Sequence, residues 1–283
     1  MPYVSFQTRE LQPRQLVGKY VGDDIAPLVT DTAGRSLKAL LNRGGNLSRF
    51  DAVTDERFSP DGIDFLPPII APGKIFCIGL NYHAHRIETG NIERDYPTVF
   101  SRFATCLVGH DQSVWRPRVS EKMDFEGELA VVIGRDAHHV KEADAMDFVA
   151  GYSCFNDISI RDWQRHTSQF TPGKNFMRTG AFGPALVTKE ELPDPFALTL
   201  STRLNGKQMQ HTTTDLMIFP IHELIAYIST FTRLEAGDVI VTGTPGGVGV
   251  KRQPQVFMQP GDTVEIDISG VGVLKNVVVD EPG

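Results

Sequence analysis

Three carboxylates beside two apolar segments could hold a divalent metal ion. Glu126 and Glu128 stand before the apolar run 129–134, and in a strand they point to the same face; Asp157 follows a second short apolar segment. Buried like charges repel and lose hydration unless a cation joins them. Three carboxylates suit a hard ion such as Mg²⁺ or Mn²⁺, which leaves positions open for water and substrate. The alternative is that both glutamates face water on a half-exposed strand, the commoner fate of carboxylates.

A histidine and a glutamate three residues apart could form a general base. In a short helix, Glu88 would orient the imidazole of His85, as in a base that activates water. The alternative is an ordinary surface pair. Another reading makes His83, His85 and Glu88 metal ligands, as in cupins. It requires a further histidine on a later strand, and none follows with suitable spacing.

Basic and amide side chains downstream could face the same cavity. Asp157, Arg161 and Gln164 are spaced i, i+4, i+7, so a helix over 157–164 would place them on one stripe; the alternative is a surface Asp–Arg pair. Lys174 lies among turn residues, where it could hold a substrate carboxylate or stabilise an oxyanion. The alternative is a solvated loop lysine.

The glycine-rich loop from Gly243 to Gly249 does not match a phosphate-binding loop. It lacks the Gly-Lys-Ser/Thr ending. We interpret it as a tight turn that brings backbone N–H groups and the Thr244 hydroxyl near a ligand. The chain contains no G-x-S-x-G elbow, so a serine hydrolase of that type has no support.

The composition is that of a globular protein with a sizeable core. The chain has 283 residues, of which 41% are hydrophobic, and its net charge of −7 argues against nucleic acid or an anionic membrane as main partner. Three widely spaced cysteines and the absence of a secretory pattern or a membrane-length apolar run lead us to expect the cytoplasm.

The order of the expected elements predicts a β-rich α+β fold, not a doubly wound sheet. Strands outnumber helices, Asn205-Gly206 is a strong hairpin signal, and Pro220 opens a helix whose apolar stripe ends at Phe231. A further helix is plausible over 141–149. We expect residues 1–72 to form a small domain that covers or orients the main body, residues 73–283.

Several motifs occur in a recognisable order along the main body. They are Gly79-Leu80-Asn81-Tyr82 with His85 and Glu88, Asp124-Phe125-Glu126-Gly127-Glu128-Leu129, Asn156-Asp157 with Arg161, Asp162 and Gln164, Lys174 with Gly183-Pro184, Thr242 to Gly249, and Pro260-Gly261-Asp262. In this order they resemble the fumarylacetoacetate hydrolase superfamily. The resemblance implies a mixed β-sandwich roll with a small N-terminal domain, and a homodimer.

The resemblance also implies roles for individual residues. One Mg²⁺ or Mn²⁺ ion per subunit would be held by Glu126, Glu128 and Asp157. His85 and Glu88 would form a catalytic dyad on a mobile lid. Lys174 would take part in catalysis, and the substrate contacts would be Tyr82, Arg102, Arg161, Gln164 and Thr244. Arg102-Phe103 departs from the Lys-Pro of many relatives, and Met177 and Thr179 also differ from frequent family choices.

The resemblance implies an enzyme that cleaves a carbon–carbon bond by hydrolysis. The substrate would be an acylpyruvate or related β-diketo acid, similar to fumarylpyruvate or fumarylacetoacetate, in the catabolism of aromatic compounds. His85 would deprotonate water, and Lys174, Arg161 or Gln164 would stabilise the oxyanion. Alternatives within the family are a 2-hydroxyhepta-2,4-diene-1,7-dioate-type isomerase and an oxaloacetate decarboxylase. An alternative of another class is a metal-dependent ligand-binding protein without turnover.

Overall fold

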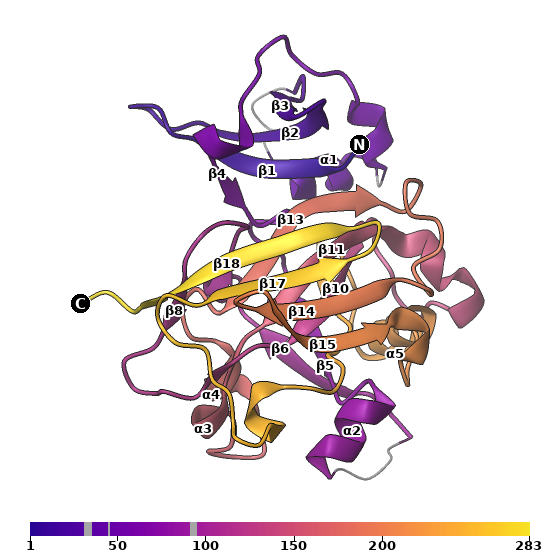
Figure 1. Ribbon diagram of the computed structural model, residues 1–283. Helices are drawn as coiled ribbons and strands as arrows, with labels where there is room; N and C mark the ends of the chain where they lie inside the picture. The colour runs from indigo at the N-terminus through magenta and orange to yellow at the C-terminus, as the bar shows by residue number, and fades with distance from the viewer. Residues whose placement is uncertain (31–35, 45, 91–94) are drawn as a thin grey trace.

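The computed structural model describes residues 1–30, 36–44, 46–90 and 95–283, and within them eleven strands form one large sheet (Figure 1). Its order is β3-β2-β1-β13-β11-β10-β16-β5-β6, with β4 paired to β1 and β7 to β13. The bounds of these strands are β1 (Tyr3–Thr8), β2 (Gln15–Val21), β3 (Asp24–Pro27), β4 (Ile63–Leu66), β5 (Ile75–Gly79), β6 (Thr98–Arg102), β7 (Leu107–Val108), β10 (Gly127–Ile133), β11 (Val149–Asp157), β13 (Gly180–Thr188) and β16 (Val239–Val241).

A second sheet packs against one face of the first. Its five strands run in the order β15 (Lys207–Thr213), β14 (Thr199–Leu204), β17 (Thr263–Ile268), β18 (Gly272–Asp280) and β8 (Val114–Arg116). Asn205 and Gly206 both have positive φ, 52° and 76°, as the hairpin between β14 and β15 requires. A short pair, β9 (Met123–Asp124) with β12 (Ser159–Ile160), completes the strands of the described residues.

Strand β10 lies between two hydrophobic cores. Its residues Leu129 and Val131 pack in one core with Leu200 and Ile266 of the second sheet. Alternate residues, Ala130 and Val132, pack in the other core. Because every residue of β10 is buried, the apolar run next to the glutamates is a two-sided core strand, as the sequence indicates. The β-rich α+β sandwich fold is therefore confirmed.

The helices of the described part are short except for one. They are α1 (Leu37–Asn42), α2 (His83–Thr89), α3 (Arg161–Gln164), α4 (Thr171–Lys174) and α5 (Ile221–Phe231), with 3₁₀ helices η2 (Leu47–Phe50), η3 (Pro60–Gly62), η4 (Ala104–Cys106), η5 (Glu142–Phe148), η6 (Thr214–Leu216) and η7 (Gly249–Lys251). The expected helix over 141–149 is thus the 3₁₀ helix η5. In the ranges that the structure describes, no helix is long and apolar enough to cross a membrane.

The long helix α5 follows Pro220 as expected, with one correction. Its buried stripe consists of Ile221, Leu224, Ile225 and Ile228. Phe231, which we expected to continue this stripe, is 56% exposed. It is the last residue of the helix, where the ring meets Phe76 edge-on and leaves much of its surface to solvent.

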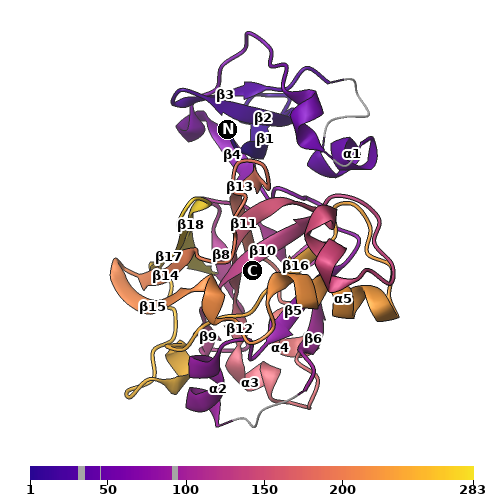
Figure 2. The ribbon, with the colours of Figure 1, turned by 90° about the vertical axis from the view of Figure 1, so that its right-hand side faces the viewer.

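The N-terminal segment lies at the end of the molecule opposite α2 and α3 (Figures 1 and 2). Its strand β1 joins the large sheet through Tyr3, which pairs with Leu186 of β13. Tyr3 and Leu40 also share one hydrophobic core with Phe155 of the main body. The segment therefore packs on the sheet far from α2, and its division from the main body at residue 72 remains a proposal.

Candidate metal centre and active site

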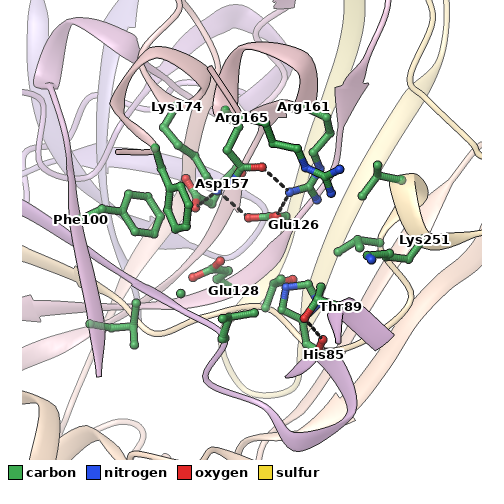
Figure 3. Close-up of a pocket in the computed structure, with 18 residues that line it drawn as sticks. His85, Thr89, Phe100, Glu126, Glu128, Asp157, Arg161, Arg165, Lys174 and Lys251 are labelled. Carbon is green, nitrogen blue, oxygen red and sulfur yellow. Dashed lines mark hydrogen bonds and ion pairs between the residues drawn. The ribbon is translucent and has the colours of Figure 1, made fainter. Parts of the chain in front are cut away.

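Two neighbouring strands bring the three predicted carboxylates together. Glu128 lies in β10, Asp157 ends β11, and Glu126 immediately precedes β10. The Asp157 N–H donates to the Glu126 carbonyl (2.8 Å), and the Glu126 N–H donates to the side chain of Asn156 (3.0 Å). One oxygen of each carboxylate lies within 4.8 Å of the others, and all three side chains are buried (Figure 3). The geometry suits a shared ion.

The predicted helix over 157–164 is wrong in its first half. Asp157 is extended at the end of β11, and Ser159 and Ile160 pair with β9. Only Arg161–Gln164 are helical. The strand pairing takes the backbone groups that a helix would have used. Asp157, Arg161 and Gln164 still line one cavity, because the chain turns between the strand and α3.

Basic side chains neutralise two of the three carboxylates. Lys174 donates from Nζ to Glu126 Oε2 (2.6 Å) and also contacts Asp157. Arg161 reaches Glu126 Oε1 (2.6 Å), and Arg102 pairs with Asp157. Lys174 is 1% exposed, which excludes the solvated loop lysine.

The docking of α4 on α3 turns Lys174 inward. Gly173 packs directly on α3, where a Cβ would lie 2.4 Å from the backbone nitrogen of Gln164. Only glycine allows this close approach. Lys174, the next residue and the last of α4, is therefore held beside the carboxylates.

The third carboxylate, Glu128, has no basic partner among the described residues. It accepts the backbone N–H of Gly243 (2.5 Å) and is 2% exposed. Burial, together with Asp157 and Glu126, raises the pKa of Glu128 well above its usual value. For Glu126, burial also favours the neutral form, but Arg161 and Lys174 outweigh it and hold the pKa well below the usual range. Glu128 is therefore a buried acidic group without a compensating positive charge. A divalent ion held by the three carboxylates would supply that charge.

The predicted dyad is assembled on α2. His85 Nδ1 lies 2.8 Å from Glu88 Oε1, and the other Glu88 oxygen accepts the Gly247 N–H (2.9 Å). Gly90, with φ of 72°, ends the helix. His85 is buried and lines the cavity. A carboxylate at Nδ1 favours a proton there, which leaves Nε2 free to act as a base.

A cavity of about 220 Å³ contains most of the predicted site. The predicted residues that line it are His85, Glu126, Glu128, Asp157, Arg161, Gln164, Lys174 and Thr244. Glu88 does not line the cavity, but it contacts His85, which does. Two predicted substrate contacts, Tyr82 and Arg102, are not lining residues: Tyr82 packs in the core, and Arg102 holds Asp157 from behind. The structure thus places Arg102 where it supports Asp157. The roles of the lining residues remain predictions.

The glycine-rich loop lies beside the cavity, which Thr244 lines, and its expected nearness to a ligand stays a prediction. Three of its N–H groups, those of Gly243, Gly247 and Gly249, donate to Glu128, Glu88 and Asp124. The Thr244 hydroxyl donates to the Gly127 carbonyl (3.0 Å). The loop therefore holds the carboxylates of the site in place, which the sequence alone did not indicate.

Sequence reasoning gave no role to several residues at or beside the cavity, among them four that matter for its charge and shape. Phe100, Arg165 and Lys251 line the cavity. Asp124 lies beside it, and its carboxylate accepts a 2.7 Å hydrogen bond from Arg161. Asp124 stands in a motif that we recognised, next to the glutamates. Arg165 directly follows such a motif and Lys251 lies two residues after another, and their charge was the available signal.

Removal of the Arg102 side chain should destabilise the protein strongly. Arg102 is 3% exposed, pairs with Asp157 and donates to the Ile158 carbonyl (2.5 Å). We expect Arg102→Met to lower the free energy of unfolding by about 3 kcal/mol, because it leaves a buried carboxylate short of a partner. Urea denaturation measures this. As control, Arg116→Met breaks a pair with an exposed aspartate, Asp280, and should cost less than about 1 kcal/mol. Equal losses would contradict the buried pair.

The dyad should give stability that disappears in acid. Burial raises the pKa of Glu88, but His85 and the Gly247 N–H outweigh it, so the folded pKa lies below its usual value. The stabilisation is then fully present above the unfolded pKa, about 4.5, and is lost as pH falls through the folded pKa. We expect Glu88→Gln to be less stable than wild type at pH 7, with a difference that vanishes in stronger acid. Urea denaturation at several pH values measures it; exposed Glu121→Gln is the control. A constant difference would contradict the ionised dyad.

Comparisons with known proteins agree with this architecture. The family model described as fumarylacetoacetate (FAA) hydrolase C-terminal matches residues 74–279. The chain is 43% identical over 218 residues to the mitochondrial oxaloacetate tautomerase Fahd2a of Rattus norvegicus, covering 77% of this chain and 70% of the relative.

Two solved structures are similar over nearly the whole chain. One is a fumarylacetoacetate hydrolase from psychrophilic Exiguobacterium antarcticum, with a TM-score of 0.85, 31% identity and coverage of 99% of this chain and 100% of that one. The other is a 5-carboxymethyl-2-hydroxymuconate delta-isomerase from Mycobacterium smegmatis, with a TM-score of 0.79, 30% identity and 100% coverage of both chains.

Proposed function

The chain belongs to the fumarylacetoacetate hydrolase family, and from this premise we propose that it is a metal-dependent tautomerase of a small 2-oxo acid such as oxaloacetate. The observation that carries the proposal is that His85, paired with Glu88, opens into the same cavity as the three carboxylates. The tautomerase named among the relatives supports the choice of reaction.

The three carboxylates would hold the ion. When bound, a divalent ion polarises a 2-oxo carbonyl and offsets negative charge that develops on its oxygen. Mg²⁺ and Mn²⁺ both suit an all-oxygen donor set. Lys174 and Arg161, fixed by their contacts with Glu126, add positive charge next to this position.

The dyad would move the proton between carbon and solvent. With its Nδ1 against Glu88, His85 can accept a proton at Nε2 from the carbon beside the 2-oxo group. Glu88 stabilises the imidazolium that results, and the Gly247 N–H keeps Glu88 in place. Solvent supplies the proton that completes the enol at the carbonyl oxygen, and His85 releases its proton to solvent; the reverse transfers regenerate the keto form.

Hydrolysis of a carbon–carbon bond in an acylpyruvate, as expected from the sequence, is the second candidate. The same dyad could deprotonate water instead of carbon. The similar structure of a fumarylacetoacetate hydrolase supports it. Catabolism of aromatic compounds, a homodimer and a cytoplasmic location remain predictions; the name of the rat relative includes "mitochondrial".

A panel of reactions with added Mg²⁺ or Mn²⁺ separates these candidates. We expect enol-oxaloacetate to lose its ultraviolet absorbance faster with the protein than without it, and no pyruvate to appear. Pyruvate released from acylpyruvates would identify a hydrolase, and pyruvate from oxaloacetate a decarboxylase. Tight binding of 2-oxo acids without any of these reactions would identify a ligand-binding protein.

A further inference from the structure

The cavity holds two positive charges that the carboxylate cluster does not use. Four basic side chains and three acidic ones line it. Lys174 and Arg161 are paired with the acids. The side chains of Arg165 and Lys251 have no ion-pair partner within the described ranges, although they line the same cavity. With a divalent ion added, the cavity carries a surplus of positive charge, which favours a substrate with more than one negative charge.

A buried donor in the same cavity also lacks an acceptor. Arg161 is 6% exposed; its Nε donates to Asp124 (2.7 Å), and its Nη1 donates to Gln164 (3.0 Å). Its Nη2 is buried without a hydrogen-bond partner among the described residues. Because an unpaired buried N–H of a guanidinium is costly, an anionic oxygen of a ligand is the partner that this geometry calls for.

One carboxylate joins Arg161 to the backbone segment that immediately precedes Lys251. Asp124, which is fully buried, accepts the N–H groups of Gly249 (2.8 Å) and Val250 (2.9 Å) as well as Arg161 Nε. A Cβ at Gly249 would lie 1.9 Å from the Val256 carbonyl oxygen, so only glycine permits this turn. Lys251 is the next residue after this clamped segment. In Figure 3, Lys251 and Arg161 lie on the side of the cavity away from Phe100.

We infer that Lys251 and Arg165 form a subsite for the distal carboxylate of the substrate, so that 2-oxo dicarboxylates are preferred to 2-oxo acids with a neutral distal end. The inference rests on the proposed function, which places the 2-oxo acid end beside Glu126, Glu128 and Asp157. A lysine supplies a compact charge and an arginine a planar fork, and both bind carboxylates. The cavity is smaller than the roughly 300–1,000 Å³ of pockets for drug-sized ligands, which favours a short diacid.

Binding of two unreactive ligands tests the subsite without turnover. Oxamate and N-oxalylglycine share the end that imitates a 2-oxo acid, and only N-oxalylglycine has a distal carboxylate. Isothermal titration of the Mg²⁺-loaded protein gives both dissociation constants. We expect Lys251→Met to weaken N-oxalylglycine about tenfold, and the more exposed Arg165→Gln about threefold, with oxamate unchanged.

A matched lysine controls for loss of charge. Lys207 is exposed on β15 and does not line the cavity, so Lys207→Met should leave both constants unchanged. If the ratio of the two constants is the same in wild type and Lys251→Met, the subsite is overturned while the proposed function stands. If the wild-type protein binds neither ligand, the proposed 2-oxo acid site fails and the subsite fails with it.

Discussion

Glu128→Gln is expected to reduce turnover by about a thousandfold or more and yet to raise the melting temperature of the metal-free protein. Turnover falls because one of the three metal ligands loses its charge. The melting temperature rises because Glu128 is 2% exposed beside Glu126 and Asp157, with no basic partner in the described part of the chain. Glutamine removes the cost of burying an acidic group whose pKa is raised by burial and by its acidic neighbours, and it can still accept the Gly243 N–H. A gain of about 2 °C corresponds to roughly 1 kcal/mol in a chain of this size.

Thermal denaturation with and without Mg²⁺ measures both parts of this result. Wild-type protein should be stabilised by the ion, whereas the variant should lose most of that shift. Glu121→Gln, which neutralises an exposed glutamate nearby in the sequence, is the control and should change neither property. Unchanged turnover in Glu128→Gln would remove Glu128 from the metal centre. A lower melting temperature without metal would mean that its charge is already compensated.

His85→Ala is expected to lower kcat by about a hundredfold or more while leaving ligand binding at the metal centre intact. General bases contribute roughly 10²–10⁴ to rates, and His85 is the only histidine that lines the cavity among the described residues. The three carboxylates and Lys174 do not contact His85 through any hydrogen bond, so Mg²⁺-dependent binding of oxamate should persist.

A second histidine on the same helix provides the control. His83 is exposed on α2, and its Nδ1 lies 3.0 Å from Arg86, outside the cavity lining. His83→Ala should therefore retain wild-type kcat. Glu88→Gln should give an intermediate loss, because the imidazole keeps its place but loses the carboxylate that stabilises its charged form. A wild-type rate in His85→Ala would refute the role of the dyad as the base.

The candidate catalytic groups could be predicted from the sequence because they form local patterns. Glu126 and Glu128 are spaced for one face of a chain that enters a buried strand, and His85 and Glu88 are spaced for one turn of a helix. Both spacings survive in the structure, even though Glu126 lies just outside β10. The order of motifs led to the fold, which the comparisons confirm.

Other features depended on contacts between distant segments. Asp157, expected in a helix, is in a strand because it pairs with Gly180 of β13, and Ser159 and Ile160 then pair with β9; no local pattern reveals these partners. Lys174 was open to two readings, and only the packing of Gly173 on α3 decides that it is buried. Burial of a charged side chain depends on which opposite charges the fold brings to it.

The sequence by itself determined which residues are candidates for the chemistry, since residue type and short spacing set the available donors, bases and charges. Only the tertiary structure decided which of these groups contact one another. It assigned the N–H groups of the glycine-rich loop to Glu128, Glu88 and Asp124, placed Arg102 behind Asp157, and left Arg165 and Lys251 facing the cavity. The physical reason is that hydrogen bonds and ion pairs act over a few ångströms, and these partners are far apart along the chain.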